Sequence, residues 1–193
     1  MKVGKNMSLN HVGTQIIETD RLILRKFQLD DVEQMYNNWA KDPENAKYVT
    51  WKAHENIDET RKIVSEWISG YKDPNYYRWI ITLKDNSCVI GDISVIDLFE
   101  ENECCEIGYV ISKKYWNMGF MTEALHAVLN FLFKKVGFHR IQLRHDVDNP
   151  ASGRVMQKNG LKHEGIIRHA RRTNTGPWCD TSLYSILDFE FKD

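Results

Sequence analysis

Apolar and polar residues in the first third of the chain follow a strand-like period and then a helical one. The segment 21–27 carries apolar residues near the alternating spacing of a strand. Over 30–42 the apolar positions recur at i, i+3, i+4 and i+7, which predicts a helix that Pro43 stops. A second stripe of this kind predicts a helix over 56–70, with Asn56 at a capping position and a glycine at its end.

The rest of the chain alternates between strand-like runs and two further helical stripes. The strand-like run at 140–147 places Ile141, Leu143 and Val147 on one face. Six segments are predicted as strands and two as helices: the strands at 78–83, 88–97, 105–112, 140–147, 161–168 and 181–189, and the helices at 122–135 and 150–159.

This order of elements indicates the fold class. One strand, two helices and three strands are followed by a helix, a strand, a helix and two strands. Because the order is not a βα repeat, it favours an α+β fold in which helices pack on a mixed sheet. No linker-like stretch interrupts 16–193, so we predict a single domain there. Residues 1–15 are predicted to be a flexible leader, since no apolar run follows their lysines as it would in a secretory signal.

Composition narrows the classes of partner. The chain has 193 residues, 42% of them hydrophobic, and a net charge of −1, which gives no reason to expect nucleic acid or an anionic membrane as partner. No apolar stretch approaches the roughly 18 residues that span a bilayer. The four cysteines, Cys88, Cys104, Cys105 and Cys179, form no CxxC pair, so we expect no metal site and a reduced, cytoplasmic protein.

The segment 106–125 carries the strongest chemical signal. A predicted strand leads into a short loop with Gly119 at its tip, and a helix is predicted to start at Thr122. The free N–H groups and the dipole of a helix N-terminus bind anions such as a diphosphate. The pattern is neither a Walker loop nor a dinucleotide fingerprint. On its own, a glycine before a helix is more often a plain turn.

Several ordered motifs together resemble the GNAT acetyltransferases, specifically the RimJ/RimL type that acetylates ribosomal-protein N-termini. The segment WNMGFMTEAL (116–125) is similar to the family pattern Trp-Gly-x-Gly-Tyr-x-Thr-Glu-Ala, and DNPASGRVMQKNGLKHEG (148–165) is similar to its second signature. The similarity extends from about Glu18 to Phe191. It implies an α/β/α arrangement with a mixed, mostly antiparallel twisted sheet flanked by helices.

The resemblance also implies acetyl-CoA as co-substrate, without a metal. Val110 and Ile111 would pair with the pantetheine arm, while Asn149 and Ser152 would reach the pantetheine and the sulfur. Asn149 and Ser152 have helix capping as an alternative role. The diphosphate would be held by the backbone amides of Met118, Gly119, Phe120, Met121 and Thr122.

Three residues are candidates for proton transfer, because an attacking amine must lose a proton and a departing thiolate must gain one. Glu106 is the candidate base or amine-holding group, with a strand-end carboxylate as its alternative reading. By the resemblance, Ser152 is the candidate proton donor to sulfur. Tyr184 is a second candidate donor, although a tyrosine in a closing strand is more often core. His145 and Asp146 form a further candidate relay, with solvated strand-end polarity as the alternative.

Some positions depart from the family pattern. Asn117 and Met121 replace smaller residues, and Arg171 stands where the ribosomal-protein enzymes carry a glutamate base. The basic run of Arg168, His169, Arg171 and Arg172 is predicted either to recruit an acidic peptide, to contact the 3′-phosphate of CoA, or to be a solvated turn.

The predicted function is therefore an N-acetyltransferase that acts by direct attack in a ternary complex. The acceptor is predicted to be a protein or peptide N-terminus or a small amine, and the protein to be a monomer or a homodimer. Because the family's glutamate is replaced by Arg171, the competing hypothesis is a GNAT-fold module that binds CoA without turnover.

Overall fold

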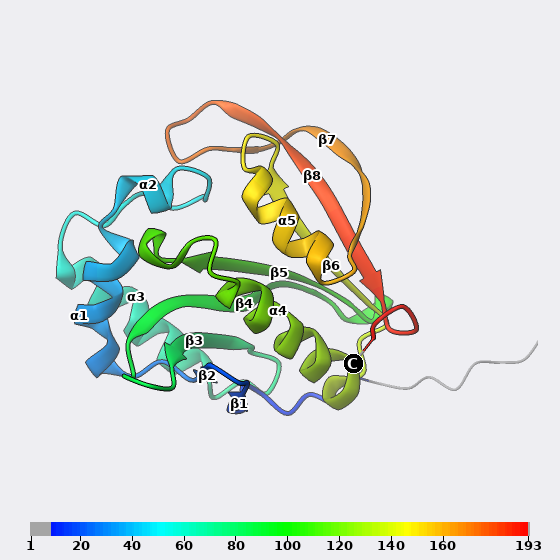
Figure 1. Ribbon diagram of the computed structural model, residues 1–193, viewed down its shortest axis with the longest axis horizontal. Helices are drawn as coiled ribbons and strands as arrows, with labels where there is room; N and C mark the ends of the chain where they lie inside the picture. Colours follow the sequence, from blue (N-terminus) through cyan, green and yellow to red (C-terminus); the bar gives the residue numbers. More distant parts are fainter. Residues whose placement is uncertain (1–8, 193) are drawn as a thin grey trace, which may run out of the picture.

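An eight-stranded sheet forms the centre of the computed structural model, which describes residues 9–192 (Figure 1). The strand order is β1-β2-β3-β4-β5-β6-β8-β7, and all neighbours are antiparallel except β5 and β6. This mixed, mostly antiparallel sheet confirms the predicted fold class. The strands are β1 (Ile17–Glu18), β2 (Leu22–Arg25), β3 (Arg78–Leu83), β4 (Val89–Phe99), β5 (Cys104–Ile111), β6 (Arg140–Asp146), β7 (Lys162–Arg172) and β8 (Trp178–Leu187).

Helices cover both faces of this sheet. One apolar cluster joins Trp39 and Val64, from the helical segment near α1 and from α3, to the sheet residues Ile80 and Val89. A larger cluster packs the apolar stripe of α4 on the other face. The helices are α1 (Val32–Met35), continued by a π-helical turn (Tyr36–Ala40), α2 (Pro43–Ala46), α3 (Ile57–Gly70), α4 (Phe120–Phe131), also continued by a π-helical turn (Leu132–Val136), and α5 (Pro150–Lys158).

Several predicted boundaries were wrong, including those of the first helix, of α4 and of β6. The first helical segment ends at Ala40, and Pro43 begins α2, because a proline at the first helical position lacks only an N–H that has no partner there. Helix α4 begins at Phe120, two residues before the prediction. Val147 lies beyond β6 and is exposed, while His145 takes the third buried position on that strand face.

Residues 9–15 differ from the predicted flexible leader, because they run along the domain and are tied to it. Asn10 donates its backbone N–H to the carbonyl of Val136 at 2.8 Å, and Thr14 donates its hydroxyl to the carbonyl of Tyr76 at 2.9 Å. The rest of the predicted leader lies outside the described residues. Within 9–192, no helix combines the length and apolar character that crossing a bilayer requires.

The two parallel strands separate after a short paired stretch. The pairing of β5 with β6 covers Cys104–Ile107 and Arg140–Leu143 only. Beyond it, β6 and its neighbours β8 and β7 swing away from β5. Helix α5 lies beside β6, and α4 lies in front of the central strands (Figure 1). The divergence leaves the second half of β5 without a strand on one side, and it positions the candidate site.

Candidate active site

The unpaired edge of β5 exposes backbone groups in an alternating pattern. Ser112 donates its N–H to Ile90 on β4 at 2.8 Å. In an antiparallel ladder, the backbone N–H and C=O groups of successive residues point alternately toward the paired strand and away from it. The backbone groups of Ile111 and Tyr109 therefore point to the free edge, while those of Val110 point to β4. Of the two residues predicted to pair with pantetheine, only Ile111 faces this edge, and Tyr109 takes the place of Val110. Ile111 offers its N–H there, because its carbonyl accepts from Asn45 Nδ2 at 2.8 Å and from Trp116 Nε1 at 2.9 Å.

The N-terminus of α4 presents open amides. Gly119 precedes the helix with φ of 80°, a left-handed conformation that favours glycine, and no side chain caps this end. Glu123 is the first residue of the helix whose N–H reaches a helix-type acceptor, the carbonyl of Gly119 at 3.1 Å. Among residues 9–192, no group accepts a hydrogen bond from the N–H of Phe120, Met121 or Thr122. These three amides can accept an anion.

Two residues of the turn between β1 and β2 hold this helix end in place. The guanidinium of Arg21 contacts the carboxylate of Glu123 at 2.7 Å, lies over the Phe120 ring, and donates to the carbonyl of Met118 at 3.1 Å. The hydroxyl of Thr19 also donates to Glu123, at 2.6 Å. Burial alone raises the pKa of Glu123, but the hydrogen bonds from Thr19 and Arg21 outweigh it and lower that pKa. The carboxylate is therefore charged at neutral pH and fixes the loop.

A cavity of about 420 Å³ opens beside this helix end. We call it the α4 cavity. It is lined by the free edge of β5, the first turn of α4 and one side of α5. Every residue predicted to bind the cofactor lines it except Met118: Val110, Ile111, Gly119, Phe120, Met121, Thr122, Asn149 and Ser152. Arg154 and Lys158, one turn apart on α5, give it positive charge.

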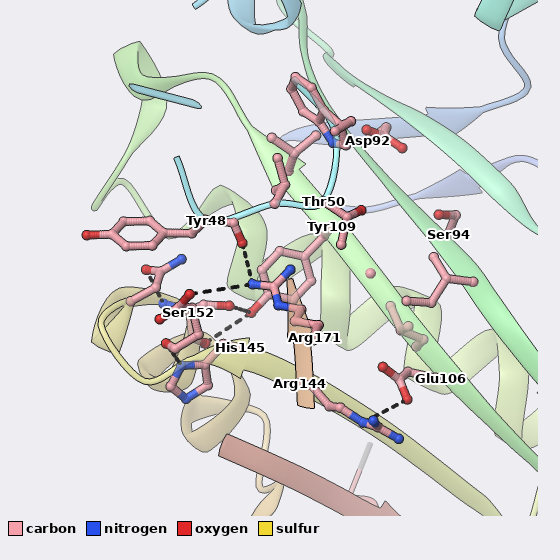
Figure 2. A pocket seen from close by; sticks show the side chains of 18 of the residues that line it. Tyr48, Thr50, Asp92, Ser94, Glu106, Tyr109, Arg144, His145, Ser152 and Arg171 are labelled. Atoms are coloured by element: carbon pink, nitrogen blue, oxygen red, sulfur yellow. Dashed lines mark hydrogen bonds and ion pairs between the residues drawn. The ribbon is translucent and has the colours of Figure 1, made fainter. Parts of the chain in front are cut away.

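A second cavity of about 510 Å³ lies toward the face of the sheet covered by α3. We call it the α3 cavity. Figure 2 shows the polar side chains that enter it from β4, β5 and β6 and from the loop between α2 and α3. Six residues line both cavities, so the two meet: Tyr48, Val49, Tyr109, Val110, Asn149 and Ser152.

A hydroxyl pair stands at this junction. The hydroxyl of Tyr109 lies 2.9 Å from Oγ of Ser152 and 3.0 Å from the Ser152 carbonyl. Burial raises the pKa of Tyr109, and the hydrogen bond with Ser152 offsets that only in part, so the phenol keeps its proton. Asn149 caps α5 through the N–H of Ser152, which confirms its capping role. The structure therefore brings Ser152 and Asn149 together as predicted and adds Tyr109.

Glu106 lines the α3 cavity and is 7% exposed. Its Oε2 accepts from Gln142 Nε2 at 2.8 Å and contacts Arg144 Nε at 3.1 Å. No described residue contacts its Oε1, which is free to accept a proton or a hydrogen bond. The alternative reading as an exposed strand-end carboxylate does not hold, because Glu106 is buried inside a cavity.

The other charged residues of the α3 cavity are also paired. Arg78 contacts Asp92, and Arg171 lies 3.9 Å from Asp146 while donating to the Tyr48 carbonyl at 2.6 Å. Burial raises the pKa of Asp92, and Arg78 compensates only in part. Two histidines, His54 and His145, also line this cavity, and burial lowers the pKa of each. Both imidazoles are therefore neutral at pH 7.

Tyr184 lies away from both cavities. It is buried in the core on β8, where its hydroxyl accepts a hydrogen bond from Gln157 at 3.2 Å. The structure does not bring this predicted donor to the site. In the predicted relay, the Nδ1 of His145 lies 2.7 Å from the Asp146 carbonyl, not from its carboxylate. The pair therefore has no direct side-chain contact.

Comparison with known proteins identifies the family. Residues 21–162 match the acetyltransferase (GNAT) domain. The chain belongs to the GNAT acetyltransferases. It is 33% identical over 172 residues to an uncharacterized N-acetyltransferase, YoaA, of Bacillus subtilis, covering 89% of this chain and 96% of that protein. A crystal structure of a GNAT-family acetyltransferase from Bacillus anthracis has a TM-score of 0.80 at 30% identity, covering 91% of this chain and 100% of that one.

The resemblance to the ribosomal-protein enzymes is also confirmed. The ribosomal-protein-serine acetyltransferase of Escherichia coli is 28% identical over 132 residues, covering 68% of this chain and 72% of that enzyme. As a GNAT acetyltransferase, this protein is an acetyl-CoA-dependent enzyme that transfers an acetyl group to an amine.

Two features of this GNAT site were missed or misplaced from the sequence. Of the predicted basic run, only Arg171 lines the α3 cavity, and none of its members lines the α4 cavity. The cations of the α4 cavity are Arg154 and Lys158, whose i, i+4 spacing was a usable signal of a shared helix face. Tyr109 gave no such signal, because its alternation with Ile107 and Ile111 is also typical of a core residue.

Proposed function

We propose that this enzyme binds acetyl-CoA in the α4 cavity and an amine in the α3 cavity, and that the amine attacks the thioester directly in a ternary complex. The observation that carries the proposal is the meeting of the two cavities at Tyr109 and Ser152. An acetyl group at this junction would be within reach of both substrates, so no covalent enzyme intermediate is needed.

The α4 cavity offers a partner for each part of the cofactor. The open amides of Phe120, Met121 and Thr122 would hold the diphosphate. The N–H and carbonyl of Tyr109 and the N–H of Ile111 would pair with the amides of the pantetheine arm, as an added strand pairs with a sheet edge. One of these N–H groups would also stabilise the negative charge that develops on the carbonyl oxygen of the thioester.

The proposed chemistry balances with two proton transfers. The neutral amine nitrogen forms a bond to the carbonyl carbon, and the C–S bond breaks. Glu106, through its free Oε1, takes the proton that the amine loses, directly or through a water. Ser152, whose hydroxyl Tyr109 holds in place, donates a proton to the departing thiolate. Water then returns a proton to Ser152 and takes the proton held by Glu106, so both side chains recover their starting states. The products are an N-acetyl amide and free CoA.

Thiol release tests this proposal. Mixing the enzyme with acetyl-CoA and a panel of amines and N-terminal peptides should yield free CoA, read with a thiol reagent, and an acetylated amine by mass spectrometry. A melting temperature that rises with acetyl-CoA while no amine in the panel releases thiol would favour the binding module instead.

The basic pair on α5 gives a second test. Reversing both charges (Arg154→Glu with Lys158→Glu) is expected to weaken acetyl-CoA binding by about 10- to 100-fold, because each cation would contact a cofactor phosphate. Isothermal titration at several salt concentrations measures this loss, which salt should reduce. The matched control, Arg61→Glu with Lys62→Glu on α3, changes the net charge equally but lines neither cavity. Equal losses in both variants would contradict the assignment.

A further inference from the structure

The ion pair of Glu106 and Arg144 presents opposite charges side by side in the α3 cavity. The two side chains touch through Glu106 Oε2 and Arg144 Nε at 3.1 Å, and Figure 2 shows the pair on one wall of the cavity. Glu106 lies deep, with 9% of its side chain exposed, and Arg144 lies nearer the opening, with 37% exposed. This wall therefore carries a negative group deep in the cavity and a positive group nearer its opening.

Each member of this pair keeps unused hydrogen-bonding capacity. No hydrogen bond within residues 9–192 reaches Oε1 of Glu106 or comes from the terminal nitrogens of Arg144, and the ion pair makes its 3.1 Å approach through Nε and Oε2. The two terminal nitrogens of Arg144 hold four N–H donors in a planar fork, which suits a carboxylate. An acceptor for a cationic amine and a donor for an anion thus lie next to each other.

The charge balance of the cavity restricts what can bind there. Its three carboxylates, on Asp92, Glu106 and Asp146, each lie within 4 Å of an arginine. A polycation would find no unpaired carboxylate, and a simple anion would add an uncompensated charge to a balanced site. A ligand that carries one positive and one negative charge adds no net charge to the site.

We infer that the acceptor is a small amino-acid-like amine, with its nitrogen at Glu106 and a carboxylate close to that nitrogen on Arg144. This inference rests on the proposed function and specifies its substrate class. The amine and the carboxylate of an α-amino acid are separated by one carbon. This short spacing matches the direct contact between the side chains of Glu106 and Arg144. The amine would lie deeper in the cavity, and the carboxylate would lie toward the opening.

Matched acceptors test the inference on the wild-type enzyme. Thiol release from acetyl-CoA is measured with each standard amino acid and with its carboxamide. The carboxamides keep the amine and lose the negative charge. For the amino acids that react, kcat/KM should exceed that of the matching carboxamide by about 10- to 100-fold, the effect of a charge-assisted hydrogen-bonded pair.

The variant Arg144→Gln should abolish this preference. Loss of the cation beside Glu106 affects both acceptors alike, so the ratio of the two is the readout: KM for the amino acid should rise by about 10- to 100-fold relative to KM for the carboxamide, whereas Arg144→Lys should keep part of the preference. The control Arg61→Gln, an exposed arginine on α3 outside both cavities, should keep the full preference.

The remaining outcomes each overturn the inferred acceptor class, and they differ in what they say about the proposed function. If wild type treats acids and carboxamides alike, or Arg144→Gln lowers both equally, the acceptor class is wrong while acetyl transfer stands. If carboxamides or peptides react and free amino acids do not, the inference is also overturned. Thiol release from no amine at all would overturn the proposed function, and the acceptor class with it.

Discussion

Replacing Glu106 by glutamine is expected to lower kcat at saturating amine by about 10²- to 10⁴-fold, the usual contribution of a general base. Glutamine keeps the length and planarity of the side chain, and its oxygen can still accept a hydrogen bond from Gln142 Nε2. It cannot take a proton from the amine. Thiol release measures kcat. Acetyl-CoA should still raise the melting temperature, because Glu106 does not line the α4 cavity.

A second buried carboxylate gives the matched control. Asp31 is 4% exposed, pairs with Arg25 at 2.7 Å and lines neither cavity. Both Asp31→Asn and Glu106→Gln remove one charge of a buried pair and should lower the melting temperature. Only Glu106→Gln should lower kcat. Unchanged turnover in Glu106→Gln would show that another group accepts the proton.

Replacing Gly119 by valine is expected to weaken acetyl-CoA binding by about 100-fold. Gly119 has φ of 80°, where a β-branched residue costs roughly 1–2 kcal/mol, and a Cβ there would lie 3.5 Å from Arg21 Nη2. Relief of this strain would turn the amides of Phe120 to Thr122 away from the diphosphate. Losing one or two charge-assisted hydrogen bonds, at about 1.5–3 kcal/mol each, accounts for the change. Isothermal titration with acetyl-CoA measures it.

Gly137 separates this effect from backbone strain. It has φ of 92°, a Cβ there would meet nothing within 4 Å, and it lines neither cavity. Gly137→Val should therefore cost stability and leave acetyl-CoA binding intact. If Gly119→Val binds acetyl-CoA as tightly as the wild type, the N-terminus of α4 is not the diphosphate site.

Features contained in one continuous stretch of chain were predictable from the sequence. The strand, glycine and helix of 106–131 lie in consecutive positions, so local spacing indicated the open helix N-terminus before the fold was known. The Asn149 cap and the extent of α3 were predicted for the same reason, since each depends on side chains within one or two turns. Pro43 was misread because proline serves both to end one helix and to begin another.

The pairings across the site were decided by tertiary structure alone. Nothing in the one-dimensional pattern shows that β6 leaves β5 after Leu143, and this divergence gives Tyr109 its free backbone edge and opens both cavities. Arg144 meets Glu106, and Arg171 meets Tyr48, only because segments far apart in the sequence lie together. Likewise, the sequence pattern does not distinguish Tyr184 from Tyr109, because each is a tyrosine within a predicted strand. The sheet buried one and placed the other beside Ser152.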